Sequence, residues 1–132
     1  MKYLKDCVFC KIANNEIPVF KIWEDEKYLA FLANAPVSEG STVVIPKKHK
    51  DSYIFNIDAE SVSELMEAAR KVAKILDTKL DGVVRSMAVF EGLEVPHLHV
   101  KLFPIYKDKI THTHEAHVIS NEELEKVAKK LR

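Results

Sequence analysis

The stretch "VPHLHVKLFP", residues 95–104, alternates polar and apolar side chains. Side chains two positions apart on a β-strand project from the same face, so His97, His99 and Lys101 would stand in one row. The apolar residues between them would face the opposite way, into a core. A strand that gives one face to two imidazoles and an ammonium is either a solvent-facing edge strand or part of a site that handles a phosphate, a metal or a proton.

The composition is that of an ordinary water-soluble domain. The chain has 132 residues, with 20 basic and 20 acidic side chains and a formal net charge of zero. This length predicts one domain over residues 1–132, and the balanced charge predicts that nucleic acid is not a partner. We find no secretory signal pattern and no apolar run of 18 residues, so we expect a cytoplasmic protein without a membrane partner.

The order of the expected elements predicts an α+β domain built on an antiparallel sheet. A long helix begins at Asp58, a good N-cap, or at Ser61, which has the capping-box spacing to Glu64, and it ends at Asp81-Gly82. The chain is expected to open with a metal or turn knuckle at the CxxC, followed by a short helix that closes before Pro18. The other expected elements are a β-hairpin in 19–33, strands in 41–46, 83–92 and 96–104, and a last helix in 120–132.

Cys7 and Cys10, the only cysteines, form a CxxC pair. In a reducing compartment such a pair predicts metal or redox chemistry in preference to a disulfide. Structural zinc requires four nitrogen or sulfur ligands, and His49 and His97 are the candidates for the third and fourth, provided that the strands beside them are neighbours. From the residues alone, a redox or idle CxxC with surface histidines remains open.

Four segments together resemble the histidine-triad (HIT) superfamily of nucleotidyl hydrolases and transferases. They are "CVFCKIANNEIP", "WEDEKYLAFL", "VVIPKKHK" and "GLEVPHLHVKLFP", and they occur in the order and spacing of that family. The resemblance implies a five-stranded antiparallel sheet with a long helix, and a homodimer whose two sheets join. It also implies a structural Zn²⁺ ion held, as in the zinc-containing branch, by Cys7, Cys10, His49 and His97.

The resemblance implies a chemistry for His99. In active members the residue at this position attacks the α-phosphorus of a nucleoside phosphate ester or phosphoramidate and forms a covalent nucleotidyl-histidine, which water or another acceptor then resolves. The implied ligand is a purine nucleotide or nucleoside phosphate, and Phe31 lies where members often line the base pocket.

The chain also departs from the family pattern. The third triad position is Lys101, which can lower the pKa of His99 and reach a phosphate oxygen as a point charge. Five other positions that match ligand-contacting positions of the family carry a different type of residue in this chain: Ala33, Ser41, Ser86, Leu93 and Glu94. We therefore predict catalytic roles for His99 and Lys101, and nucleotide contacts from Phe31, Ser41, Ser86, Gly92 and Lys101.

These departures keep a second function open. Each lost hydrogen bond to a nucleotide would cost about 1–3 kcal/mol, so the chain could be a catalytically silent, zinc-stabilised binding protein that retains only the scaffold. A redox CxxC protein is a weaker alternative, because no thioredoxin-like βαβ pattern surrounds the motif. The histidines of "THTHEAH" (His112, His114 and His117) have a metal-binding spacing that is more typical of adventitious surface chemistry.

Overall fold

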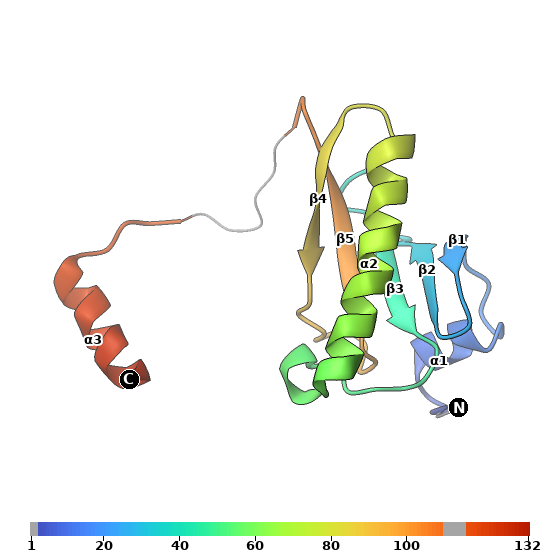
Figure 1. Ribbon diagram of the computed structural model, residues 1–132, viewed down its shortest axis with the longest axis horizontal. Coiled ribbons are helices and arrows are strands. Elements are labelled where there is room, and N and C mark those ends of the chain that lie inside the picture. The colour runs from blue at the N-terminus through green and yellow to red at the C-terminus, as the bar shows by residue number, and fades with distance from the viewer. Residues whose placement is uncertain (1–2, 110–115) are drawn as a thin grey trace.

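Five strands form one antiparallel sheet in the order β1-β2-β3-β5-β4, as a computed structural model shows for residues 3–109 and 116–132 (Figure 1). The strands are β1 (Lys21–Glu24), β2 (Tyr28–Leu32), β3 (Thr42–Pro46), β4 (Val83–Val89) and β5 (Val100–Tyr106). The predicted α+β class, the hairpin and the five-stranded antiparallel sheet are therefore confirmed. The joining of two such sheets across a dimer stays a prediction.

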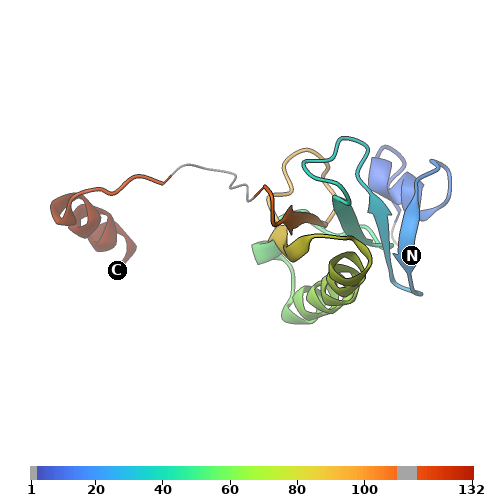
Figure 2. The same ribbon diagram turned by 90° about the horizontal axis from the view of Figure 1, so that it is seen from above.

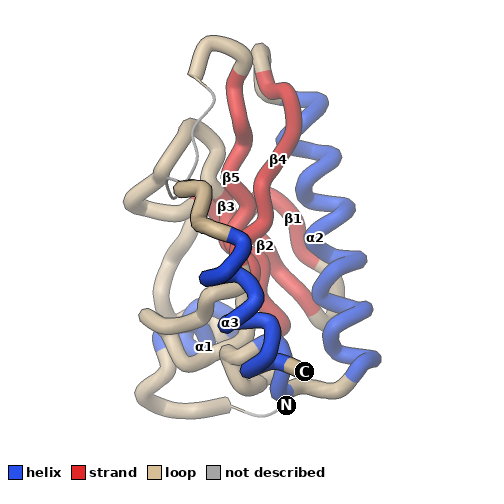
Figure 3. Tube along the Cα trace, turned by 90° about the vertical axis from the view of Figure 1, so that its left-hand side faces the viewer, coloured by secondary structure: helices blue, strands red, loops and turns tan. Residues whose placement is uncertain are grey.

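Helix α2 (Ala59–Lys79) covers one face of this sheet (Figures 2 and 3). Asp58 is its N-cap, because the Asp58 side chain accepts a hydrogen bond from the Ser61 backbone N–H at 2.8 Å. The alternative start at Ser61 is wrong: Ser61 lies within the helix, where its backbone supplies the capped N–H. Leu65 and Val72 are fully buried against Leu98 and Val100, so burial of this apolar face supplies the main packing of the helix.

The opposite face of the sheet is covered by α1 (Val8–Ala13) and the residues around it. Phe9 and Ile12 of α1 pack with Leu29, Phe31 and Ile45 of the central strands. Because both faces of β2 and β3 are covered, almost every residue of these two strands is buried, instead of every second one. This second, smaller core contains the two cysteines.

The largest differences from the predicted strand boundaries are at the start of β5 and the end of β4. β5 begins at Val100, so His97 and His99 lie in the extended segment that leads into the strand. The alternation nevertheless holds through this segment, since Leu98 packs toward α2 while His97 and His99 lie on the α1 side. β4 ends at Val89, three residues earlier than predicted, and a 3₁₀ turn (Ile54–Asn56) precedes α2.

The predicted C-terminal helix is present as α3 (Asn121–Leu131), with Ser120 as its N-cap. In Figures 1 and 2, α3 stands apart from the sheet, on the side of the edge strand β4. It buries none of its residues. Within residues 3–109 and 116–132, no helix is long and apolar enough to cross a membrane.

We predict that Leu65→Ala lowers the free energy of unfolding by about 2–5 kcal/mol, because it leaves a cavity under α2 where the side chain is now 0% exposed. The adjacent Met66 is 45% exposed, so Met66→Ala is the matched control and should cost less than about 1 kcal/mol. Urea denaturation at constant zinc concentration measures both values. Equal losses in the two variants would contradict the assigned packing of α2.

Candidate metal centre and nucleophile

Cys7, Cys10, His49 and His97 converge at one point, although 90 residues separate the first from the last. We call these four residues the Cys–His cluster. Cys7 caps α1 and Cys10 lies within it, while His49 follows β3 and His97 precedes β5. Their ligand atoms all lie within 4.8 Å of one another. The predicted condition, that the segments carrying the two histidines be neighbours, is met because β3 pairs with β5.

The spacing of these atoms fits a tetrahedral ion. Nδ1 of His97 lies 3.4 Å from Sγ of Cys7 and 3.5 Å from Sγ of Cys10, and Nδ1 of His49 lies 3.4 Å from Sγ of Cys10. Zinc bonds of about 2.3 Å to sulfur and about 2.05 Å to nitrogen, set at the tetrahedral angle, place sulfur and nitrogen about 3.6 Å apart. The side chains present therefore fit zinc with little rearrangement.

Hydrogen bonds already orient the potential ligands. The Nε2–H of His97 donates to the Pro46 carbonyl at 2.8 Å, which fixes the tautomer that leaves the Nδ1 lone pair facing the cysteines. Burial lowers the pKa of His97 to about 4, so its ring is neutral at physiological pH. Backbone N–H groups of Leu4 and Cys10 donate to Sγ of Cys10 and Cys7 at 3.3 and 3.4 Å.

Phe9 connects the Cys–His cluster to His99. It stands between the two cysteines on α1, and its ring packs edge-on against His97 (centroids 5.8 Å apart) and His99 (5.1 Å). Any displacement of α1 would therefore remove a packing partner from both histidines. Anchoring α1 through its cysteines thus fixes the position of His99 as well.

His99 is 2% exposed, and its orientation is well defined. Its Nδ1 lies 2.7 Å from the His97 carbonyl oxygen; a carbonyl only accepts, so Nδ1 carries the proton and Nε2 keeps its lone pair. Nε2 has no hydrogen-bond partner within the part of the chain that the structure describes. None of the described buried side-chain nitrogen or oxygen atoms lacks a partner, so Nε2 retains contact with solvent. Neighbouring residues 97 and 99 thus carry opposite tautomers, one aimed at the cysteines and one able to act as a nucleophile.

The charges around His99 include a pair of acids that sequence reasoning did not assign. Burial is the largest cause that lowers the pKa of His99, and the Lys101 ammonium lowers it further, whereas Glu91 and Glu94 raise it. Lys101 Nζ lies 3.5 Å from Glu91 and 3.9 Å from Glu94. Both acids lie in the β4–β5 loop. The path of this loop brings them to Lys101, and the sequence does not specify that path.

Two predicted nucleotide-contacting residues lie on the α1 side of the sheet. Phe31 is 5% exposed and packs edge-on against Phe9, with ring centroids 5.7 Å apart. Ser41 is 1% exposed, and its hydroxyl accepts from the Val37 and Ser38 backbone N–H groups and donates to the Ser38 carbonyl. The Ser41 hydroxyl thus holds the turn before β3. Nucleotide contacts from Phe31 and Ser41 stay predictions.

Ser86 and Gly92 occupy different surroundings. Ser86 donates to Asp77 of α2 at 2.8 Å, so the structure places it on the α2 face and does not bring it together with His99. Gly92 has a φ of +62°, and a Cβ there would collide with the Ser52 carbonyl. Only glycine lets the β4–β5 loop cross so close to the segment after His49. Contacts from Ser86 and Gly92 to a nucleotide stay predictions too.

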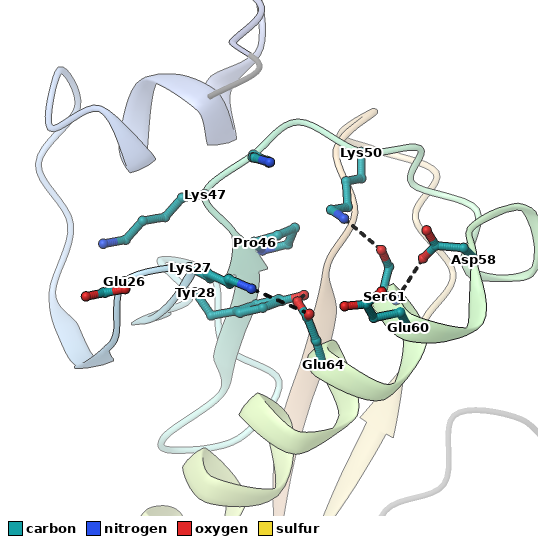
Figure 4. A pocket seen from close by; sticks show the side chains of 11 residues that line it. Glu26, Lys27, Tyr28, Pro46, Lys47, Lys50, Asp58, Glu60, Ser61 and Glu64 are labelled. Carbon is teal, nitrogen blue, oxygen red and sulfur yellow. Dashed lines mark hydrogen bonds and ion pairs between the residues drawn. The ribbon is translucent and has the colours of Figure 1, made fainter.

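One further described histidine and one pocket do not belong to the Cys–His cluster. His117 is exposed, and His112 and His114 lie outside the described residues. A pocket of about 360 Å³ lies between the N-terminus of α2 and the ends of β2 and β3 (Figure 4). Two lysines of this pocket have partners within it: Lys27 lies 3.7 Å from Glu64, and Lys50 donates to the Ser61 hydroxyl at 2.7 Å. Neither a cysteine nor a histidine lines this pocket, so it is separate from His99.

Comparison with known proteins identifies the family. The HIT domain model matches residues 14–108. The adenosine 5'-monophosphoramidase of Saccharomyces cerevisiae is 34% identical over 103 residues, which are 78% of this chain and 65% of that protein.

Solved structures agree in fold. A HIT family protein from Bacillus anthracis superposes with a TM-score of 0.75 at 31% identity, covering 96% of this chain and 95% of the other. A zinc-bound histidine triad family protein from Mycobacterium smegmatis shares the fold (TM-score 0.73, 24% identity, 85% of this chain and 84% of the other). The match to the family model, the level of identity and the shared fold together show that this chain belongs to the HIT family.

Proposed function

We propose that this protein is a nucleotidyl hydrolase or transferase that acts through His99 on nucleoside phosphate esters or phosphoramidates. The observation that supports this most directly is the state of the His99 ring: buried, oriented through Nδ1, and left with an Nε2 lone pair that no described residue engages. The relative from yeast, a protein named for adenosine 5'-monophosphoramidase activity, supports the class of substrate.

The proposed reaction has two steps. Nε2 of His99 attacks the α-phosphorus, so a nitrogen–phosphorus bond forms while the bond from phosphorus to the leaving group breaks, and the leaving group takes a proton from solvent. Water, or another acceptor, then attacks the same phosphorus and loses a proton to solvent; the nitrogen–phosphorus bond breaks, and neutral His99 is restored. The low pKa of His99 suits this role, because the neutral ring is the nucleophilic form at neutral pH.

Lys101 has a supporting role in this proposal. Its ammonium is partly buried and lies between the carboxylates of Glu91 and Glu94. A substrate phosphate that approaches His99 competes with these carboxylates for the ammonium. The negative charge on the phosphoryl oxygens strengthens that contact in the transition state. Before substrate binds, Glu91 and Glu94 hold the Lys101 ammonium in place.

We propose that the Cys–His cluster holds a structural zinc ion. All four ligands come from the protein, so the donor set is closed, as in structural sites rather than catalytic ones. Bound metal would supply the positive charge that keeps the buried thiols deprotonated, against the burial that raises the pKa of Cys10. Two cysteines that bind a metal must stay reduced, as cysteines do in a reducing compartment. We therefore propose a cytoplasmic location.

We also propose a homodimer that joins the two sheets. β4 is an edge strand of seven residues, and an edge of that length presents unpaired backbone groups that favour strand addition. Pairing of β4 with β4 of a second copy around a two-fold axis is the closed arrangement that satisfies both edges equally.

One alternative retains specific support. The Ser41 hydroxyl is hydrogen-bonded to the backbone of residues 37 and 38, and the Ser86 hydroxyl donates to Asp77 of α2. Two positions from which we predicted nucleotide contacts therefore offer no free hydroxyl beside His99. A silent scaffold that binds zinc and has lost its nucleotide pocket would have these features. Formation of a nucleotide adduct on His99 separates this alternative from the enzyme.

We predict that incubation with adenosine phosphoramidate, followed by a mild alkaline quench, yields protein that carries a nucleotide on His99. His99→Gln should abolish the adduct because the amide is not nucleophilic, whereas His117→Gln, at an exposed histidine outside the site, should leave it unchanged. Peptide mass spectrometry locates the adduct. If the unaltered chain forms none and AMP or GMP gives no thermal shift, the silent scaffold is correct.

We predict that His49→Ala lowers the zinc content from about one ion per chain to less than about half, because it opens one of four ligand positions. His117→Ala is the matched control and should keep the full content. Both are measured by elemental analysis of protein purified without an affinity tag, since a polyhistidine tag binds metal. Equal zinc in both variants would remove His49 from the ligand set.

We predict that Lys101→Met lowers the turnover of the phosphoramidate about 10- to 100-fold, since one charge contact that strengthens in the transition state is lost. Lys101→Arg keeps the charge and should recover part of that rate. Lys48→Met, which removes a lysine next to the metal ligand His49, should change the rate less than about threefold. A Lys101→Met enzyme with unchanged kcat/KM would show that the ammonium only solvates the site.

A further inference from the structure

The β4–β5 loop places two carboxylates beside the proposed nucleophile. Lys101 projects from the same side of its segment as His99, two residues earlier, and side chains at this spacing stand about 6–7 Å apart. The Lys101 ammonium lies 3.5 Å from Glu91 and 3.9 Å from Glu94. Both carboxylates raise the pKa of His99, so their charge also acts on the reactive ring. We call Glu91 and Glu94 the acidic pair.

The two members of the acidic pair are held differently. Glu91 uses one carboxylate oxygen for Lys101 and accepts a hydrogen bond from the Leu93 backbone N–H, at 3.3 Å, with the other. The loop itself therefore orients Glu91. The side chain of Glu94 is 82% exposed, so it is free to turn toward a ligand. One carboxylate is positioned in advance, and the other can adjust to what binds.

The charges of this group of side chains do not balance. Lys101 supplies one positive charge, and the acidic pair supplies two negative ones. A bound nucleoside phosphoramidate adds a further negative charge on its phosphate and draws the Lys101 ammonium toward itself. No other lysine or arginine of residues 3–109 and 116–132 forms an ion pair with the acidic pair. Repulsion between like charges then opposes binding, unless the substrate itself carries a cation.

The acidic pair lies within reach of a leaving group on that phosphate. An ammonium contacts a phosphate oxygen at about 2.8 Å. Added to the distances of 3.5 and 3.9 Å, this places a carboxylate oxygen of each acid no more than about 7 Å from the phosphate oxygen that Lys101 contacts. With bonds of about 1.5 Å, a three-carbon chain on the phosphoramidate nitrogen carries its terminal ammonium about 6 Å from phosphorus. Such an ammonium can contact either acid.

We propose that the acidic pair is a specificity-determining subsite, which selects nucleoside phosphoramidates whose amine leaving group carries a second, positively charged amine. The inference rests on the proposed function and names its substrate class. Nε2 of His99 forms a bond to phosphorus, the phosphorus–nitrogen bond breaks, and the departing nitrogen takes a proton from solvent. The second amine stays charged throughout. A polyphosphate leaving group brings negative charge to the acidic pair and is disfavoured.

Three phosphoramidates of AMP with leaving groups of matched length test this selection: the 3-aminopropyl (cationic), butyl (neutral) and 2-carboxyethyl (anionic) compounds. In the unaltered chain, kcat/KM for the cationic compound should exceed that for the anionic one at least about tenfold, with the neutral compound between them. Replacing both acids (Glu91→Gln with Glu94→Gln) should reduce this ratio to less than about threefold. Glu60→Gln is the matched control: Glu60 is exposed on α2, which covers the other face of the sheet, so the ratio should stay unchanged.

A binding measurement separates this inference from the chemistry of His99. Calorimetry on the His99→Gln protein gives the dissociation constants of the aminopropyl and carboxyethyl compounds without turnover. If the unaltered chain turns over none of the compounds, these constants decide: tighter binding of the aminopropyl compound, lost when both acids are replaced, supports the acidic pair although the proposed function fails. Equal kcat/KM for all three compounds supports the proposed function and overturns this inference. Absence of both turnover and selective binding overturns both.

Discussion

The arrangement of this protein depends on Phe9, which lies between Cys7 and Cys10 in the sequence and packs against the rings of His97 and His99. Cys7 and Cys10 place α1 against His49 and His97, and Phe9, between those cysteines, contacts the rings of both His97 and His99. A metal bound by the Cys–His cluster would thus fix a helix, and that helix would form a wall of the nucleophile site. Without the metal, the six-residue helix would be held on the sheet only by the packing of residues such as Phe9 and Ile12.

His97 and His99 lie on one backbone segment but carry their proton on different ring nitrogens. His97 donates through Nε2 to Pro46 and turns Nδ1 toward the cysteines, whereas His99 donates through Nδ1 to His97 and keeps the Nε2 lone pair. Each carbonyl acceptor therefore determines which nitrogen is reactive. Burial keeps both rings neutral, which is the state required of a metal ligand and of a nucleophile alike.

Sequence reasoning identified the elements that have strong local signals. The CxxC pair, the Asp58 cap and the alternation around His97 and His99 are local patterns. They led to the helices and the sheet that the structure shows, and to four side chains that converge at one point. Other features depend on tertiary contacts that no local pattern specifies: the contact of Glu91 and Glu94 with Lys101, the bonds that occupy the Ser41 hydroxyl, and the direction of Ser86 toward α2. The start of β5 at Val100 was missed because an extended segment and a paired strand have the same side-chain alternation.

The most direct measurement of the central claim is X-ray absorption at the zinc edge of untagged protein. If the Cys–His cluster binds the metal and thereby positions α1 and His99, the spectrum should show two sulfur neighbours at about 2.3 Å and two nitrogen neighbours at about 2.0–2.1 Å. A shell of only oxygen and nitrogen would place the zinc elsewhere. It would contradict the claim that a metal bound by the Cys–His cluster holds α1 against His97 and His99.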